Sequence, residues 1–310
     1  MLLRAIIPVG PEEHARGRLP GTRPTGAVDD ASAARQVREM FSRIAPHYDL
    51  LNHLLSLRFD VSWRNRVARR FAKVLRQPEV QALDLCCGTG DLTLALEAQS
   101  REHFSQGGVS QGEISQGGAS DERNSQVPSR GYQGRTAAAG SPAQRARFLG
   151  ADFAHPMLLR AREKAGHQHS HGAHSTIEFL EADALRLPFT DESFDLVTTA
   201  FGFRNLANYG DGLAEVRRIL RPGGSVAILE FAEPEGVLFG RLFRFYFRRV
   251  LPKIGGIISS NAQAYGYLPN SVARFPPPRE LAELMQRAGF KDVAFERWTG
   301  GIVALHSAIR

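Results

Sequence analysis

Short apolar runs alternate along the chain with segments in which apolar residues recur every three or four positions. The runs cover residues 80–85, 147–150, 194–200 and 225–231, and the periodic segments between them cover 91–98, 156–165 and 209–220. Short runs of this kind are typical of buried strands, whereas the periodic spacing predicts amphipathic helices. Strands that alternate with helices predict an α/β fold, a doubly wound and mostly parallel sheet covered on both faces.

The carboxyl-terminal pattern differs from the rest. Residues 291–298 and 302–308 are two strand-like runs, and Thr299, Gly300 and Gly301 join them. A short glycine-containing connection between two such runs predicts a hairpin. We therefore expect the sheet to end in an antiparallel edge.

Two segments lack the alternation. Residues 1–30 are rich in Gly, Pro and Arg, and residues 99–143 are rich in Ser, Gln, Gly and Arg, with a five-residue repeat that starts at Ser105, Ser110 and Ser115. Such composition buries too little apolar surface to offset the entropy lost on ordering. We predict a disordered amino-terminal extension and one domain over 31–310, with a low-complexity insertion at about 99–143.

Composition narrows the class of protein. The 310 residues are 43% hydrophobic, and none of the apolar runs reaches the length that a membrane-spanning helix requires. The two cysteines, Cys86 and Cys87, are adjacent, which does not suit the geometry of a structural disulfide. These features predict a reduced, cytoplasmic globular protein.

The most specific motif is a glycine loop between a predicted strand and a predicted helix. Residues 82–93 read Ala-Leu-Asp-Leu-Cys-Cys-Gly-Thr-Gly-Asp-Leu-Thr. A phosphate-binding loop would need Gly-Lys-Ser/Thr, and a dinucleotide fingerprint would place a third Gly at Thr93. An acidic residue at the strand end, here Asp84, followed by Gly88 and Gly90, favours an S-adenosylmethionine loop, with a purely structural turn as the remaining alternative.

Two further carboxylates follow later strands. Dinucleotide folds place a ribose-binding carboxylate roughly 20 residues beyond the loop. Asp152 lies 62 residues beyond Gly90, and the interval is 17 residues once the 45 residues of the insertion are removed. We expect Asp152 to bind ribose hydroxyls and Asp183 to accept a hydrogen bond from an adenine amino group.

The sequence resembles the class I methyltransferases and, more narrowly, the ubiquinone/menaquinone biosynthesis C-methyltransferases of the UbiE/MenG type. Phe-Gly-Phe-Arg-Asn at 201–205 and Gly-Gly-Ile-Val-Ala-Leu-His at 300–306 are the most selective of the blocks that carry this resemblance. The other blocks lie at 41–52, 83–93, 220–224, 229–231 and 264–269. The resemblance covers about residues 37–310, apart from the insertion.

The resemblance implies a seven-stranded class I fold, S-adenosyl-L-methionine as the cofactor and a polyprenyl hydroquinone as the substrate. It favours demethylmenaquinol in menaquinone biosynthesis over 2-polyprenyl-6-methoxybenzoquinol in ubiquinone biosynthesis. It also implies a cofactor site formed by Tyr48, Gly88, Thr89, Gly90, Asp152, Asp183 and Ala184. The family often has Ser immediately before Phe-Gly-x-Arg-Asn, where this chain has Ala200. We therefore do not expect the side-chain hydrogen bond that this Ser would make to the cofactor.

Methylation of a hydroquinone carbon requires loss of the neighbouring hydroxyl proton and stabilisation of the resulting oxyanion. We expect Arg204 to stabilise that oxyanion or to order a water molecule. We expect Asn205 to position the same oxyanion or water molecule. A buried salt bridge is the structural alternative for Arg204. No metal is expected, because the four histidines at 167, 169, 171 and 174 have no neighbouring cysteine or carboxylate ligand.

The net charge of +7 is local. Residues 58–76 carry seven basic residues and one acidic residue, and residues 237–258 carry five basic residues and no acidic one. The second segment includes an amphipathic pattern at 237–251, which suits a helix at a membrane surface or an ordinary helix packed on the sheet. We expect transient binding at the inner face of the cytoplasmic membrane. A nucleic-acid methyltransferase is the rival class, but the Asp/Asn-Pro-Pro-aromatic element for amine methylation is absent, and we expect no nucleic-acid partner. A homo-oligomer is left open.

Overall fold

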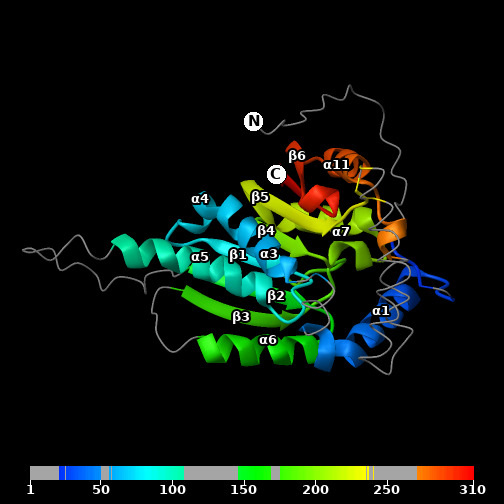
Figure 1. The fold of residues 1–310 in the computed structure, drawn as a ribbon, viewed down its shortest axis with the longest axis horizontal. Helices are drawn as coiled ribbons and strands as arrows, with labels where there is room; N and C mark the ends of the chain where they lie inside the picture. The colour runs from blue at the N-terminus through cyan, green and yellow to red at the C-terminus, as the bar shows by residue number, and fades with distance from the viewer. Residues whose placement is uncertain are drawn as a thin grey trace, which may run out of the picture.

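The computed structural model describes residues 21–24, 26–49, 56, 58–107, 146–168, 175–234, 236, 240 and 271–310 (Figure 1). The strands are β1 (Gln81–Leu85), β2 (Ala146–Asp152), β3 (Ser175–Glu181), β4 (Phe194–Ala200), β5 (Leu220–Phe231), β6 (Lys291–Trp298) and β7 (Val303–Ile309). The α-helices are α1 (Asp30–Ile44), α3 (Phe59–Arg70), α4 (Ala72–Leu75), α5 (Asp91–Gly107), α6 (His155–Gln168), α7 (Tyr209–Ile219) and α11 (Pro278–Arg287). Short 3-10 turns lie at η1 (Ala45–His47), η3 (Phe203–Asn205) and η5 (Thr299–Gly301).

The strands form one seven-stranded sheet in the order β3-β2-β1-β4-β5-β7-β6. The first five strands in this order, β3, β2, β1, β4 and β5, are parallel to their neighbours. Strand β7 runs antiparallel to both β5 and β6. The sheet therefore confirms the predicted α/β fold and its antiparallel carboxyl-terminal hairpin.

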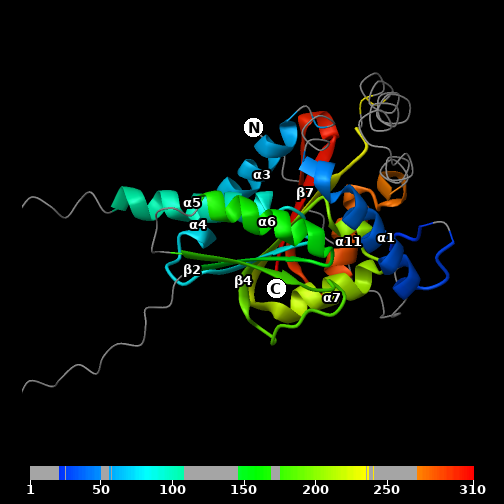
Figure 2. The same cartoon turned by 90° about the horizontal axis from the view of Figure 1, so that it is seen from below.

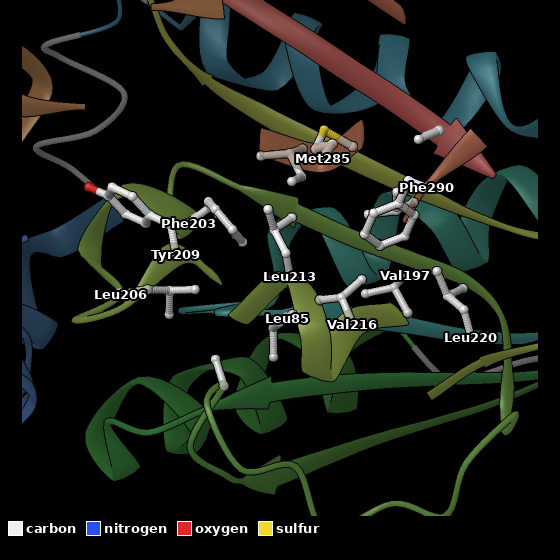
Figure 3. Close-up of a cluster of buried hydrophobic side chains, with 14 of the residues drawn as sticks. Leu85, Val197, Phe203, Leu206, Tyr209, Leu213, Val216, Leu220, Met285 and Phe290 are labelled. Carbon is white, nitrogen blue, oxygen red and sulfur yellow. The ribbon is translucent and has the colours of Figure 1, made fainter. Parts of the chain in front are cut away.

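Helices cover both faces of the sheet because successive strand residues point to opposite sides. On one face, Ala82 and Leu196 belong to a core that includes α3, α4 and α5. On the other, Leu83 and Val197 belong to a core with α7 and α11. Figure 2 shows α3, α5 and α6 on one side of the sheet and α7 on the other, and Figure 3 shows the second core, where side chains of α7 meet Met285 and Phe290.

The carboxyl ends of the parallel strands lie at one edge of the sheet, and α1 lies at this edge (Figure 2). Asp29 begins α1 with a capping box, because its carboxylate accepts a hydrogen bond from the Ser32 amide and the Ser32 hydroxyl accepts one from the Asp29 amide. After α1, η1 leads to Tyr48 and Asp49. We call residues Ala45–Asp49 the cover segment, because it packs on the start of α6.

The structure differs from the expected boundaries in two places. Helix α5 continues through Gln99, where we expected the insertion to begin, as far as Gly107. Glu97 and Arg101 form an i,i+4 ion pair on this continuation, which is rich in good helix formers. Residues 108–143, the block at 264–269 and, apart from Gly240, the amphipathic pattern at 237–251 lie outside the described residues.

The second difference concerns the amino-terminal segment that we expected to be disordered. The amides of Gly21 and Thr22 donate hydrogen bonds to the carbonyls of Ala207 and Leu206 at 3.0 and 2.9 Å. The Thr22 side chain is buried, and its hydroxyl donates to the Arg204 carbonyl. Residues 21–24 therefore form a strap on the loop that follows β4, and the expectation of disorder does not extend to them.

Candidate active site

A cavity lies at the carboxyl edge of the sheet, beside the cover segment. Its empty volume is about 680 Å³, open solvent at the mouth included. Its walls come from α1, the cover segment and the ends of β1, β2, β3 and β4. Its lining includes Phe41, Tyr48, Cys86, Gly88, Asp152, Met157, Asp183, Ala184, Phe201, Gly202 and Asn205.

The loop after β1 forms the floor of the cavity. Cys86, Gly88 and Gly90 all have positive φ, of 55°, 55° and 82°. Glycine is required at Gly90 for a second reason, because an added Cβ would lie 3.0 Å from the Ala161 Cβ and from the Phe179 ring. Gly88 lines the cavity itself, so its missing side chain leaves the backbone open to a ligand.

Asp152 joins the loop to the end of β2. One carboxylate oxygen accepts a hydrogen bond from the Gly88 amide at 2.9 Å, and the other accepts one from the Ala154 amide at 2.8 Å. Burial raises the pKa of Asp152 to about 6, although these backbone hydrogen bonds oppose the rise. The carboxylate is thus fixed in the cavity wall, with lone pairs left to accept hydrogen bonds from a ligand.

Asp183 and Ala184 follow β3 and also line the cavity. The Asp183 carboxylate accepts a hydrogen bond from the Leu185 amide at 2.9 Å. Ala184 is buried and belongs to the core under α7. The structure therefore brings Asp152 and Asp183 to one cavity, as their places after successive strands predicted. Ala184, which the family resemblance implied, lines the same cavity.

Asp84 lies beneath the loop, and it is absent from the cavity wall. Its carboxylate accepts hydrogen bonds from the Thr93 hydroxyl at 2.8 Å and from the Thr198 hydroxyl at 3.2 Å. Burial raises its pKa to about 7. In this structure Asp84 fastens β1 to the first turn of α5 and to β4, so any contact with the cofactor stays a prediction.

Thr89 is also absent from the residues that line the cavity, so its contact with the cofactor stays a prediction. Its hydroxyl donates to Asp49 of the cover segment at 2.6 Å and accepts a hydrogen bond from Lys164 at 2.9 Å. Tyr48, the neighbour of Asp49, does line the cavity. Its ring lies edge-on to Phe41, with 6.1 Å between ring centroids, so the two aromatic residues close the cavity on the side of α1.

Arg204 and Asn205 follow β4 in η3, and the structure places them differently. Asn205 lines the cavity, and its amide lies 3.4 Å from the Phe201 carbonyl. Arg204 is buried and forms an ion pair with Glu230 at 3.1 Å, while the Arg204 backbone amide donates to the same carboxylate. Burial raises the pKa of Glu230, and Arg204 opposes that rise. This is the buried salt bridge that was the structural alternative for Arg204.

The loop after β4 carries features that the sequence reasoning did not assign. Phe201 has φ of 61°, unusual for a bulky residue, and its carbonyl accepts a hydrogen bond from the Arg204 guanidinium. An added Cβ on Gly202 would lie 2.3 Å from the Cys86 Cβ, so only glycine fits there. The glycine within Phe-Gly-Phe-Arg-Asn was the signal that could have found this close approach.

Cys86, Cys87 and His306 are titratable residues to which we assign packing roles. Burial raises the pKa of the Cys86 and Cys87 thiols, which keeps them protonated and poorly nucleophilic. His306 is buried in β7, where its Nε2 lies 2.7 Å from the Pro278 carbonyl, and burial lowers its pKa to about 4.

The parallel sheet with an inserted antiparallel β7, and the glycine loop at the end of β1, define a class I S-adenosylmethionine-dependent methyltransferase. A solved structure from Thermotoga maritima, described as a S-adenosylmethionine-dependent methyltransferase and possible histamine N-methyltransferase, shares this fold. It aligns with a TM-score of 0.51 and 17% identity, over 87% of this chain and 98% of that one. The likeness concerns the fold alone.

The chain belongs to the ubiE/COQ5 methyltransferase family, whose model matches residues 29–310. A demethylmenaquinone methyltransferase of Deinococcus radiodurans is 41% identical, over 91% of this chain and 95% of its own length. One of Thermus thermophilus is 42% identical, over 86% of this chain and 98% of its own. A Geobacter sulfurreducens protein named ubiquinone/menaquinone biosynthesis C-methyltransferase UbiE is 37% identical, over 88% of this chain and 87% of its own.

The cavity fits the cofactor of this class. Asp152 presents a fixed carboxylate, which can accept hydrogen bonds from two ribose hydroxyls. Ala184 and Met157 offer apolar wall against a flat base, and Asp183 offers an acceptor beside them. Gly88 leaves a space that a side chain would fill, 3.5 Å from the Tyr48 ring.

Among the residues that the structure describes, every helix is too short or too polar to span a lipid bilayer.

Proposed function

We propose that this enzyme transfers the methyl group of S-adenosylmethionine to a ring carbon of demethylmenaquinol. The observation that carries the proposal is family membership, together with two relatives of that name at 41% and 42% identity that align over nearly their whole lengths. 2-Polyprenyl-6-methoxybenzoquinol is the second candidate acceptor, because the relative at 37% identity bears a name that covers both quinone pathways.

S-Adenosylmethionine supplies an electrophilic methyl group bound to a positively charged sulfur. The residues of this chain have to hold the cofactor, align the acceptor and exclude water. In the proposal, Asp152 binds the ribose, Asp183 and Ala184 contact the adenine, and Gly88 permits close approach of the backbone. Tyr48 and Phe41 close the cavity on the side of α1.

We assign the acceptor to the part of the cavity lined by Phe201 and Asn205. Phe201 belongs to an aromatic cluster with Phe231 and Trp63, at centroid distances of 4.7 and 5.8 Å, which suits an aromatic ring as the ligand. Asn205 can donate a hydrogen bond to the oxygen that carries the developing negative charge.

Arg204 is not among the residues that line the cavity. We therefore propose that it acts on the acceptor indirectly, by holding the loop that carries Asn205 and through its charge. It donates to the Phe201 carbonyl and thereby holds the loop that carries Asn205. Its positive charge, although paired with Glu230, favours the phenolate form of an acceptor bound beside Asn205, the next residue in the chain. None of the described residues accepts a hydrogen bond from its Nη2 atom.

The test is methyl transfer from labelled S-adenosylmethionine to three acceptors: demethylmenaquinol, 2-polyprenyl-6-methoxybenzoquinol and bulk RNA. We expect label in the naphthoquinol. Label only in the benzoquinol or in RNA would refute the assignment. In the Asn205→Ala variant we expect kcat to fall roughly 100-fold while S-adenosylhomocysteine binding is unchanged.

Arg204 needs a gentler variant, because removing one partner of a buried ion pair leaves the other charge unpaired and destabilises the protein. Arg204→Lys keeps the charge but loses the fixed guanidinium geometry. We expect it to lower kcat and to leave the affinity for S-adenosylhomocysteine intact. Wild-type kcat in this variant would contradict a role for Arg204 in the reaction.

We further propose that the enzyme associates transiently with anionic membrane surfaces through α3 and α4. Arg66 and Arg70 contact Glu296, but the exposed Arg58, Arg69, Lys73 and Arg76 have no ion-pair partner among the described residues. Phe59 is 48% exposed beside them. Unpaired cations around an exposed aromatic ring favour a negatively charged lipid headgroup layer.

Cosedimentation with vesicles tests this surface. The full chain should bind vesicles that contain anionic lipid at low salt, and binding should weaken as salt is raised. Charge reversal by Arg69→Glu with Lys73→Glu should weaken binding, whereas Arg287→Glu on α11 should not. Equal binding of all three proteins would refute the proposed surface.

A further inference from the structure

Lys164 on α6 occupies an unusual position beside the glycine loop. Its ammonium nitrogen lies 2.8 Å from Oδ2 of Asp49, 2.7 Å from Oδ1 of Asp91 and 2.9 Å from Oγ1 of Thr89. An ammonium group has three protons, so these three acceptors use all of them. The Lys164, Asp49 and Asp91 side chains are only 22–28% exposed.

The three acceptors belong to different pieces of the site. Asp49 ends the cover segment, Thr89 lies in the glycine loop, and Asp91 begins α5. Thr89 also donates to Asp49 at 2.6 Å, so the cover segment is fastened to the loop both directly and through Lys164. A single side chain therefore links the segment above the cavity to the loop below it.

The two carboxylates do not depend on Lys164 equally. Asp91 has a second cation, because Arg64 lies 3.2 Å from its other oxygen, and it also benefits from its place at the amino terminus of α5. Among the described residues, Lys164 is the one cation paired with Asp49. Loss of Lys164 would therefore act mainly on the cover segment.

The position of Asp49 sets that of Tyr48. Tyr48 lines the cavity, and its ring lies 3.5 Å from where a Cβ on Gly88 would stand. We propose that Lys164 is a positioning residue that holds the cover segment Ala45–Asp49 against the glycine loop and thereby sets the affinity for S-adenosylmethionine. The inference rests on the proposed cofactor use, and it does not depend on which acceptor is methylated.

Binding of S-adenosylhomocysteine to the full chain tests the proposal by calorimetry, without turnover. In Lys164→Met we expect affinity to fall roughly 3- to 10-fold, the range for one or two partly exposed ion pairs. Lys164→Arg should recover part of the loss. Lys291→Met, at an exposed lysine on the far edge of the sheet, is the matched control and should bind as the wild type does.

Asp49→Asn provides a second variant from the other side of the contact. If Lys164 acts through Asp49, the double variant should bind no more weakly than the weaker single variant, because the same interaction is lost in each. Added salt should weaken binding by the wild type and should have less effect on Lys164→Met. Amide hydrogen exchange of residues 45–49 in the ligand-free protein should be faster in Lys164→Met.

Unchanged affinity in Lys164→Met, or fully additive losses in the double variant, would overturn the proposal. In steady-state assays the variant should raise KM for S-adenosylmethionine more than it lowers kcat, and a loss confined to kcat would also contradict it. A wild-type protein that binds S-adenosylhomocysteine but does not methylate demethylmenaquinol would overturn the proposed function and leave the inference about Lys164 intact.

Discussion

The buried Asp84 carboxylate makes the stability of this fold depend on pH, and Asp84→Asn isolates its contribution. The carboxylate accepts hydrogen bonds from the hydroxyls of Thr93 and Thr198 and from the Thr93 backbone amide. A hydroxyl can accept as well as donate, so the amide of the Asp84→Asn variant finds a partner for each of its polar atoms. The variant therefore mimics the protonated acid without opening a cavity.

The magnitude follows from the shift in pKa. Burial raises the pKa of Asp84 from 3.8 to about 7. Between these values the folded state binds more protons than the unfolded state, so the free energy of unfolding falls as pH rises and levels off above about 7. A shift of roughly three units at about 1.4 kcal/mol each corresponds to about 4 kcal/mol.

Urea unfolding of the wild type and of Asp84→Asn at several pH values between 4 and 8 measures this contribution. Other buried acids affect both proteins equally, so the difference between the two curves reports Asp84. Between pH 4 and pH 8, we expect the free energy of unfolding of the variant to rise by about 4 kcal/mol relative to that of the wild type. Parallel curves would refute the reasoning, and a change of opposite sign would mean that Asp84 is stabilised as the ion.

Three further predictions concern the cavity. Because burial raises the pKa of Asp152 to about 6, affinity for S-adenosylhomocysteine should fall as pH is lowered through 6, and calorimetry of Asp152→Asn should show a flatter profile. Gly202→Ala should destabilise the protein by about 1–3 kcal/mol in urea, because its Cβ would meet Cys86, and a second change, Cys86→Gly, should restore stability. Thr22→Val should lower the free energy of unfolding by about 1 kcal/mol and raise KM for the quinol, because the strap loses its hydrogen bond to the Arg204 carbonyl. Unchanged stability and KM would exclude this role for the strap.

Much of the fold was accessible from sequence because apolar alternation and turn residues are local signals. The strands and the antiparallel hairpin follow from such signals, and parallel topology then brings Asp152 and Asp183 to one edge. The direction in which a carboxylate points depends on the elements packed around it, and local sequence does not indicate it. Asp84 turns toward Thr93 and Thr198 instead of the cavity because α5 and β4 surround it.

Contacts between distant segments were also beyond the sequence. Nothing in the spacing of Asp49 and Lys164 indicates that they meet, since the contact requires the cover segment to fold back over α6. The strap at Gly21 and Thr22 lies in a Gly-, Pro- and Arg-rich stretch, where composition indicates disorder. Its order depends on carbonyls that the loop after β4 presents.

The place of the low-complexity stretch has a consequence for how this enzyme can vary. In a parallel sheet, loops that lead from a helix into the next strand lie at the edge opposite the strands' carboxyl ends. The stretch lies between the end of α5 and the start of β2, and Figure 1 shows the end of α5 on the side of the molecule away from α1. Residues added between α5 and β2 therefore enter the chain away from the residues that line the cavity. The same position should accept an epitope tag or a fused fluorescent reporter in an active enzyme.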